Sequence, residues 1–150
     1  MSTFCRRTAE LAGYTATTDL PTVVNSADTA LAVITTAMHV PARPEVLVLV
    51  LDTDLRGQAV VIVDGTHSPD AVVEVLELLA EGAAEADNPA SFVVAAVRPG
   101  YGPLPGDADR WLELCEIVET HGCELLDWFI ISDDVAWCPR DLLAEPPRWP

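Results

Sequence analysis

The sequence contains no lysine, and its eight basic residues, all arginine, face 24 acidic residues. The lack of lysine excludes a P-loop nucleotide-binding protein, a Schiff-base enzyme and a Ser-Lys hydrolase, because each of these needs a lysine amine. The formal net charge of −16 repels nucleic-acid phosphates, and no segment gathers enough arginine to offset it. We therefore expect no binding to nucleic acid.

Long apolar runs are missing as well, although half of the residues are hydrophobic. Runs such as Val46–Leu51 are far too short to cross a bilayer, so we expect no membrane insertion. The start of the chain, Met1–Arg7, lacks the apolar stretch that a secretory signal requires. The sequence thus favours a cytoplasmic protein.

Paired metal-ligand spacings are also lacking. The four cysteines are scattered, without a C-x-x-C pair, which favours buried free thiols: Cys5, Cys115, Cys123 and Cys138. The alternative is a structural zinc site made by Cys115, His121 and Cys123. The chain also has no G-x-S-x-G motif and no Ser/His/Asp grouping that would indicate a serine hydrolase.

What is present indicates one domain of mixed α/β (α+β) class, since 150 residues is an ordinary domain length. Apolar residues at helical spacing and N-capping residues predict helices over residues 3–13, 26–39, 68–86 and 107–121. Ser68 is the expected N-cap of the third helix, with Pro69 in its first position. Unbroken Val/Leu-rich runs predict buried strands at 45–52, 58–63, 91–97 and 123–132, with a short strand at 135–137. The first two strands should form a hairpin.

The most informative segment is Ala96–Asp109, AVRPGYGPLPGDAD, a Pro/Gly-rich loop between a predicted strand and a predicted helix. It resembles the His-x-His-Pro-Ser-Gly…Pro-Ser-x-x-Asp segment of the JAB/MPN (JAMM) metalloprotease-like domains, most closely the RadC-like bacterial branch. One residue separates the first two motif positions, and ten precede the aspartate, as in that family. Ala96 and Arg98 stand at the two histidine positions, and Asp109 stands at the aspartate position.

The resemblance extends over roughly residues 45–143. Glu45 opens a strand at the position of the family's catalytic glutamate, and Gly65-Thr66 resembles the Gly-Thr after its second strand. Leu125–Ile131 is similar to the family's Leu-Leu-Asp-His-Ile-Ile strand. The resemblance implies a single three-layer domain with a mixed central sheet flanked by helices. Residues 1–44 would be a helical segment packed on that core, and residues 144–150 an irregular tail.

The resemblance also implies roles for individual residues. Glu45 matches the general base and Asp109 the carboxylate ligand, but neither alanine nor a permanently protonated guanidinium can bind zinc. We therefore expect no metal and no cofactor at the family position. Arg98 is predicted to take the place of the metal by forming an ion pair with Asp109, within reach of Glu45. The alternative is that Arg98 is an exposed charge of the loop. Asp109 would otherwise be an acid in a first helical turn, and Tyr101 either lines a recognition surface or packs.

Three functions remain open from the sequence. The leading interpretation is a catalytically inactive RadC/JAB-like domain that binds a protein partner through the groove that active relatives use for substrate. The alternative is a hydrolase of this class with an altered site, in which Glu45 and Asp109, with Asp107 or Asp127, hold a divalent ion or act in acid/base catalysis. The third is an unrelated α/β domain with a chance likeness.

Overall fold

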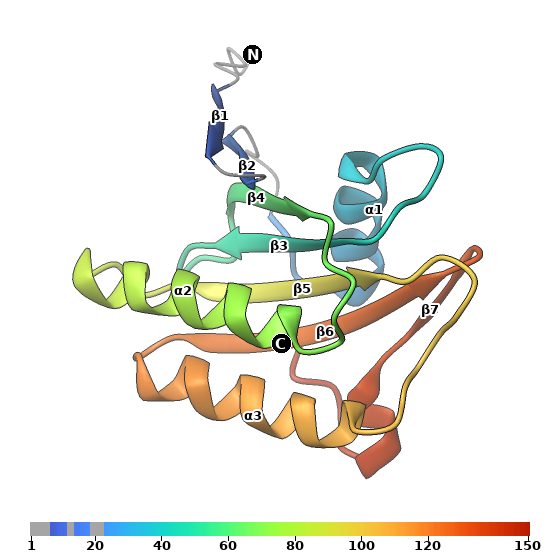
Figure 1. The fold of residues 1–150 in the computed structure, drawn as a ribbon. Helices are drawn as coiled ribbons and strands as arrows, with labels where there is room; N and C mark the ends of the chain where they lie inside the picture. Colours follow the sequence, from blue (N-terminus) through green and yellow to red (C-terminus); the bar gives the residue numbers. More distant parts are fainter. Residues whose placement is uncertain (1–6, 12–13, 19–22) are drawn as a thin grey trace.

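A mixed β-sheet forms the centre of the protein in the computed structural model, which describes residues 7–11, 14–18 and 23–150 (Figure 1). Its strand order is β1-β2-β4-β3-β5-β6-β7. The strands are β1 (Arg7–Leu11), β2 (Tyr14–Thr18), β3 (Glu45–Leu51), β4 (Gly57–Asp64), β5 (Ser91–Val97), β6 (Glu124–Ser132) and β7 (Val135–Trp137). The helices are α1 (Ala27–Ala37), α2 (Ala71–Glu85), α3 (Asp107–Thr120) and a 3-10 helix, η1 (Pro139–Leu143). The predicted α+β class is confirmed.

The helices cover both faces of the sheet, which gives three layers. One buried cluster joins α2 and α3 to one face, and a second joins α1 to the opposite face. Successive residues of β3 alternate between them: Val46 and Val48 belong to the first cluster, Leu47 and Leu49 to the second. A strand with a core on each side needs apolar residues at consecutive positions, which explains the unbroken hydrophobic runs.

The strand directions follow from the connections. β3 and β4 form the predicted antiparallel hairpin, and β3 also pairs antiparallel with β5. β5 and β6 are parallel, because helix α3 crosses between them. The β6–β7 hairpin turns at Asp133 and Asp134, whose φ angles of 48° and 67° are those of a tight hairpin turn.

The helix termini agree with the sequence in two places and differ in one. Ser26 caps α1 by accepting a hydrogen bond from the Thr29 amide, and Gly122 follows α3 with a φ of +76°. The predicted N-cap of α2 was wrong: the helix starts at Ala71, and Ser68 Oγ accepts from the Asp70 amide instead. The Ala71 amide bonds to the Ser68 carbonyl, so a tight turn precedes the helix.

The predicted helix over residues 3–13 was wrong where it can be compared. Arg7–Leu11 is strand β1, which pairs with β2, and β2 extends the sheet beyond β4. Residues of β2 such as Thr15 and Thr17 favour strands, and the edge of β4 offers amides and carbonyls that need partners. Residues 3–6 and 12–13 lie outside the described part. Residues 1–44 were predicted to form a helical segment, and α1 is the helix in the described part of that segment.

The C-terminal segment contains a short element that the sequence patterns did not indicate, η1, before the irregular residues 145–150. Trp149 in this tail packs against the α1-side cluster. Among the described helices, none is both long enough and apolar enough to span a membrane.

Candidate functional site

A buried ion pair lies where the motif segment leaves β5 and enters α3. Arg98 follows β5 directly, and its side chain is only 5% exposed. Its NH1 donates to Asp107 Oδ2 over 2.8 Å and its NH2 to Asp107 Oδ1 over 3.1 Å. Asp107 is the first residue of α3, and its side chain is fully buried. The two parallel hydrogen bonds make this the strong, two-pronged form of an arginine–carboxylate pair.

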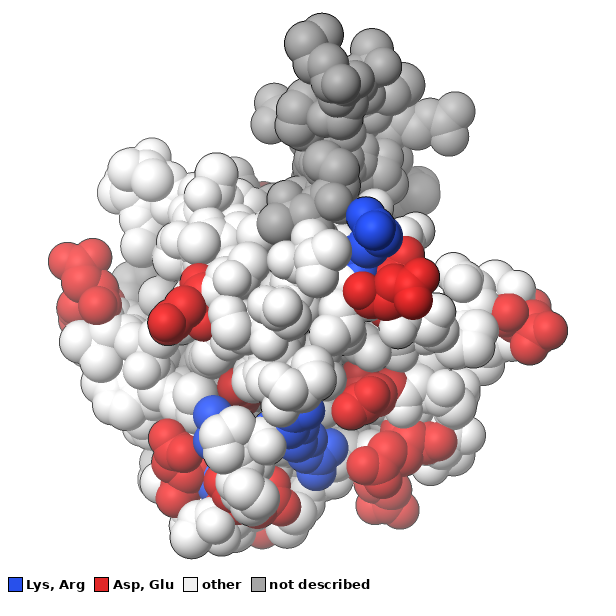
Figure 2. Space-filling model, turned by 180° about the vertical axis from the view of Figure 1, so that it is seen from behind, with Lys and Arg blue, Asp and Glu red and all other residues white. Residues whose placement is uncertain are grey.

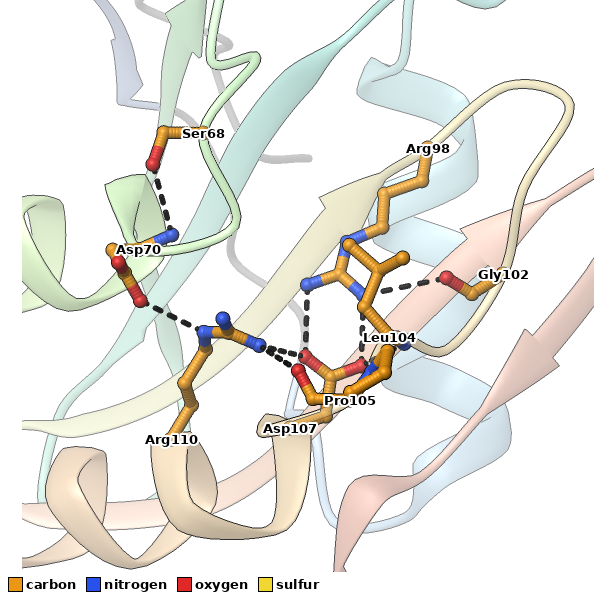
Figure 3. A network of polar contacts seen from close by, with 8 residues as sticks. All are labelled: Ser68, Asp70, Arg98, Gly102, Leu104, Pro105, Asp107 and Arg110. Atoms are coloured by element: carbon orange, nitrogen blue, oxygen red, sulfur yellow. Dashed lines mark hydrogen bonds and ion pairs between the residues drawn. The ribbon is translucent and has the colours of Figure 1, made fainter.

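Further hydrogen bonds connect the pair to the surrounding elements (Figure 3). The Leu104 amide donates to Asp107 Oδ2 over 2.6 Å, and Arg110 NH1 donates to Asp107 Oδ1 over 2.9 Å. Arg110 Nε also donates to Asp70 Oδ1, just before α2. One network therefore joins the end of β5, the proline-rich loop and the first turns of α2 and α3.

The network keeps Asp107 ionised. Burial alone would raise the pKa of Asp107, but hydrogen bonds from Arg98, the Leu104 amide and Arg110 outweigh burial and lower that pKa below its ordinary value. All the groups around the carboxylate are donors, which stabilise its charged form. Asp107 is therefore suited to holding charge in place rather than to giving up a proton.

The predicted partner of Arg98 was wrong by two residues. Asp109 is exposed in the first turn of α3, whereas Asp107 faces Arg98. Residues two apart on an α-helix point about 200° away from each other, so only one of the two acids can face the sheet. Asp109 occupies the alternative position predicted for it, an acid near the N-terminal end of a helix. The interpretation of Arg98 as an exposed loop charge is wrong as well, since its side chain is buried.

Glu45 has different partners from those predicted. It lies opposite Asp64 of β4 and Val97 of β5, and Val97 belongs to the α1-side cluster. Its carboxylate accepts from the His39 amide over 3.0 Å and from His39 Nδ1 over 2.5 Å, just beyond the end of α1. Ala96 contributes instead to the cluster on the α2 and α3 side. Neighbouring strand residues point to opposite faces, so the Glu45 carboxylate and the motif side chains lie on different sides of the sheet.

A small pocket remains at this end of the strands. Its lining includes four of the predicted site residues: Glu45, Ala96, Arg98 and Tyr101. Its volume of about 10 Å³ is room for about one water molecule. Tyr101 stands at its edge and is 39% exposed. This pocket is too small to serve as the predicted binding groove.

The residues at the motif position do not fit a zinc ion. Ala96 offers no donor atom, and the Arg98 guanidinium is permanently protonated. Asp107 points into the network but is surrounded by donors from two arginines, while Asp109 faces solvent. A zinc ion needs about three protein ligands around one point, and this arrangement does not supply them.

The alternative set of acids does not converge either. Asp127 on β6 is fully buried, where Arg140 Nε lies 3.3 Å from its Oδ1 and Trp149 Nε1 donates to its Oδ2. Burial raises the pKa of Asp127, and the nearby Arg140 charge opposes that rise. Asp127 therefore has its own arginine partner, as Asp107 does, rather than sharing an ion with Glu45 or Asp109.

The described cysteines are free thiols. Cys115 and Cys123 are buried, Cys138 is partly buried, and Cys5 lies outside the described residues. Burial raises the pKa of Cys115 and of Cys138 to about 11, so both are poor nucleophiles. The alternative zinc site is not formed, since His121 Nδ1 donates to the Ile117 carbonyl and Cys123 Sγ donates to the His121 carbonyl.

A larger groove that sequence reasoning missed lies between α1 and the β6–β7 hairpin, with a volume of about 660 Å³. Its apolar lining is Leu31, Met38, Val40, Ala42, Val97, Pro99, Ile131, Val135 and Ala136. Its polar lining is Thr35, His39, Ser132, Asp133 and Asp134. Viewed from the side turned away from α2 and α3, the surface has a wide area without charged side chains between scattered acidic groups (Figure 2). The lining comes from separate segments, which no local sequence pattern connects.

Comparison with known proteins adds no relative: no family model matches the chain, and no curated protein matches it. The resemblance to the RadC-like JAB/MPN domains therefore depends on the residues quoted for it.

Proposed function

We propose that this protein is a catalytically inactive relative of the RadC-like JAB/MPN domains that acts by binding a protein partner. The observation that carries the proposal is the burial of Arg98, which stands at a metal-ligand position of the motif, in an ion pair with Asp107. A guanidinium held there by two hydrogen bonds leaves no place for a metal-bound water, which the chemistry of the active family requires.

The order of elements also supports the relationship. The core runs as hairpin, helix, strand, motif loop, helix and strand, from β3 to β6. The motif loop joins β5 to α3 and brings Arg98 against Asp107 in the first turn of that helix, although Asp109, at the family's aspartate position, faces solvent. In the relationship that we propose, the order of elements is kept and an ion pair of side chains takes the place of the bound metal ion.

The groove between α1 and the β6–β7 hairpin is the binding surface that we propose. Its apolar lining fits apolar side chains, while Asp133 and Asp134 at its edge are exposed and enter none of the ion pairs found among residues 23–150. These acids and the net charge of −16 favour a partner segment that combines apolar residues with a basic one. The predicted binding mode is thus a short peptide segment.

A peptide-display experiment tests this function. A random peptide library is selected on the full-length protein, and the enriched peptides are then measured against two variants. Thr35→Arg places a bulky cation in the groove at an exposed helix position, whereas Leu78→Arg makes a similar change at a 64% exposed site on α2. We expect apolar–basic peptides that bind wild type and Leu78→Arg alike, with affinity at least tenfold weaker for Thr35→Arg. Selection that enriches no peptide, or peptides that bind Thr35→Arg equally well, would refute the proposal.

A further inference from the structure

On the α1 side of the sheet, three potential metal ligands meet at the point where β3 begins and β4 ends. They are His39, Glu45 and Asp64, and one ligand atom of each lies within 4.8 Å of the others. Glu45 and Asp64 are directly opposed across the β3–β4 ladder, so their backbone positions are fixed by the sheet. The Gly65 amide bonds to the Pro44 carbonyl, which continues the β3–β4 hydrogen bonding just beyond them. The cluster is therefore built on a rigid support.

The spacing between His39 and Asp64 is close to that around a tetrahedral ion, and the spacing between His39 and Glu45 is shorter. Donors about 2.1 Å from a zinc ion lie about 3.4 Å from one another. His39 Nδ1 lies 3.6 Å from Asp64 Oδ1, and 2.5 Å from Glu45 Oε2. The second distance has to open by about 1 Å to reach that tetrahedral spacing. The His39 side chain can move that far, because it is 38% exposed.

A backbone hydrogen bond orients the Glu45 carboxylate for a ligand role. Its Oε1 accepts the His39 amide over 3.0 Å, which directs Oε2 toward the imidazole. The Glu45 side chain is fully buried, so the carboxylate has little access to bulk water. A buried carboxylate beside an imidazole and a second carboxylate favours a cation that can neutralise both acids.

Arg43 competes for this position. Its NH2 donates to His39 Nε2 over 2.6 Å and to Asp64 Oδ2 over 3.0 Å. An arginine always donates, so the imidazole accepts at Nε2 and carries its proton on Nδ1, where it donates to Glu45. A metal ion on Nδ1 requires the proton to move to Nε2, which then faces the Arg43 donor. The Arg43 side chain is 51% exposed and can turn away into solvent.

We propose that His39, Glu45 and Asp64 form a binding site for a first-row transition-metal dication of the zinc type. One imidazole and two carboxylates suit such an ion better than Mg²⁺ or Ca²⁺, which prefer oxygen ligands alone. Three protein ligands leave a position for water or a ligand atom from the groove, which His39 also lines. The site lies on the opposite side of the sheet from Arg98 and does not depend on the proposed function.

Calorimetric titration of the full-length protein with zinc chloride tests the site. We expect one equivalent to bind wild type and at least tenfold weaker binding to His39→Asn, whose amide can still donate to Glu45 but is a poor ligand. The matched control is His67→Ala, because His67 is exposed and lies outside the cluster, so wild-type affinity should be kept. Arg43→Met should bind at least threefold more tightly, since it removes the competing donor.

Two additional measurements keep the test decisive. If circular dichroism shows that His39→Asn is unfolded, Asp64→Asn decides, because the Asp64 side chain is 36% exposed and tolerates replacement. The cobalt-loaded protein should show ligand-field bands without a thiolate charge-transfer band, which separates this site from the cysteines. Absence of one-site binding in wild type, retained affinity in the ligand variants, a thiolate band, or unchanged affinity in Arg43→Met would each overturn the proposal.

Discussion

Replacing Arg98 by methionine is the sharpest test of the buried network, because the change removes the charge and keeps much of the side-chain volume. Asp107 would lose the hydrogen bonds from NH1 and NH2 of Arg98 and keep those from Leu104 and Arg110. Removing one partner of a buried pair costs about 3–5 kcal/mol of unfolding free energy. Because two of the donors remain, we expect a loss of about 3 kcal/mol, at the lower end of that range.

Urea unfolding at neutral pH measures this loss. Trp128 is fully buried with its ring 5.8 Å from the Arg98 guanidinium, so its fluorescence reports on the region. The matched control is Arg56→Met, an exposed arginine that forms none of the ion pairs among the described residues, for which we expect a change within about 0.5 kcal/mol. The unfolding slope should be unchanged, because the surface exposed on unfolding stays nearly the same.

The double variant Arg98→Met, Asp107→Leu separates a lost pair from lost packing. Arg98→Met leaves the Asp107 charge buried without its main partner, and the double variant removes that charge. The double variant should therefore be more stable than Arg98→Met, although Leu104 and Arg110 then lose an acceptor. A loss below about 1 kcal/mol in Arg98→Met would refute the reasoning, since an exposed pair contributes that little. If the double variant is no more stable than Arg98→Met, the unpaired Asp107 charge is not the cause of the stability loss in Arg98→Met.

The other predictions concern acid stability, metal ligation and a helix terminus. Because the pKa of Asp107 is lowered in the folded protein, its carboxylate stabilises the fold above the pKa of the unfolded state, and this stabilisation is lost as pH falls below about 4. In Asp107→Asn, the thermal unfolding temperature should therefore depend less on pH in the acid range. The double variant Ala96→His, Arg98→His should bind one additional equivalent of zinc, measured by elemental analysis. That gain should disappear with Asp107→Asn and persist with Asp109→Asn, and the reverse pattern would contradict the observed orientation of α3. Gly122→Ala should lower the unfolding free energy by about 1 kcal/mol in a chemical melt, because its φ of +76° disfavours a Cβ although nothing crowds it. An unchanged melt would contradict this.

Much of the core could be predicted because strands with a core on both faces have an unmistakable sequence pattern. The runs Val46–Leu51 and Phe92–Val97 contain no polar residue, and the structure buries nearly all of each run. The helix at residues 107–120 was likewise predictable, from its acidic first turn and the glycine after its end. The N-terminal strands were not, because their partner is the open edge of β4, which is distant in sequence.

The candidate site could be predicted only in part, because spacing fixes position along the chain but not the direction of a side chain. The motif placed an acid opposite Arg98, yet the phase of α3 decides that Asp107 and not Asp109 faces inward. Glu45 was predicted at the right strand terminus, but the strand alternation directs it toward His39. A residue-by-residue assignment of the faces of β3 and β5 could have shown this, had their register been known.

The network around Asp107 balances its own charges, and in this it differs from the metal site that the motif implies. A zinc dication with two neutral histidines and one aspartate carries a net charge of +1, whereas the charges of Arg98 and Arg110 are balanced by those of Asp107 and Asp70. The buried Asp107 carboxylate is therefore neutralised by side chains alone, without an ion. Under the proposed function, the exchangeable water of the active family is lost, because a guanidinium has no open coordination position. A charge pair also needs no metal supply, which under the proposed function suits a domain that holds a partner rather than turns over a substrate.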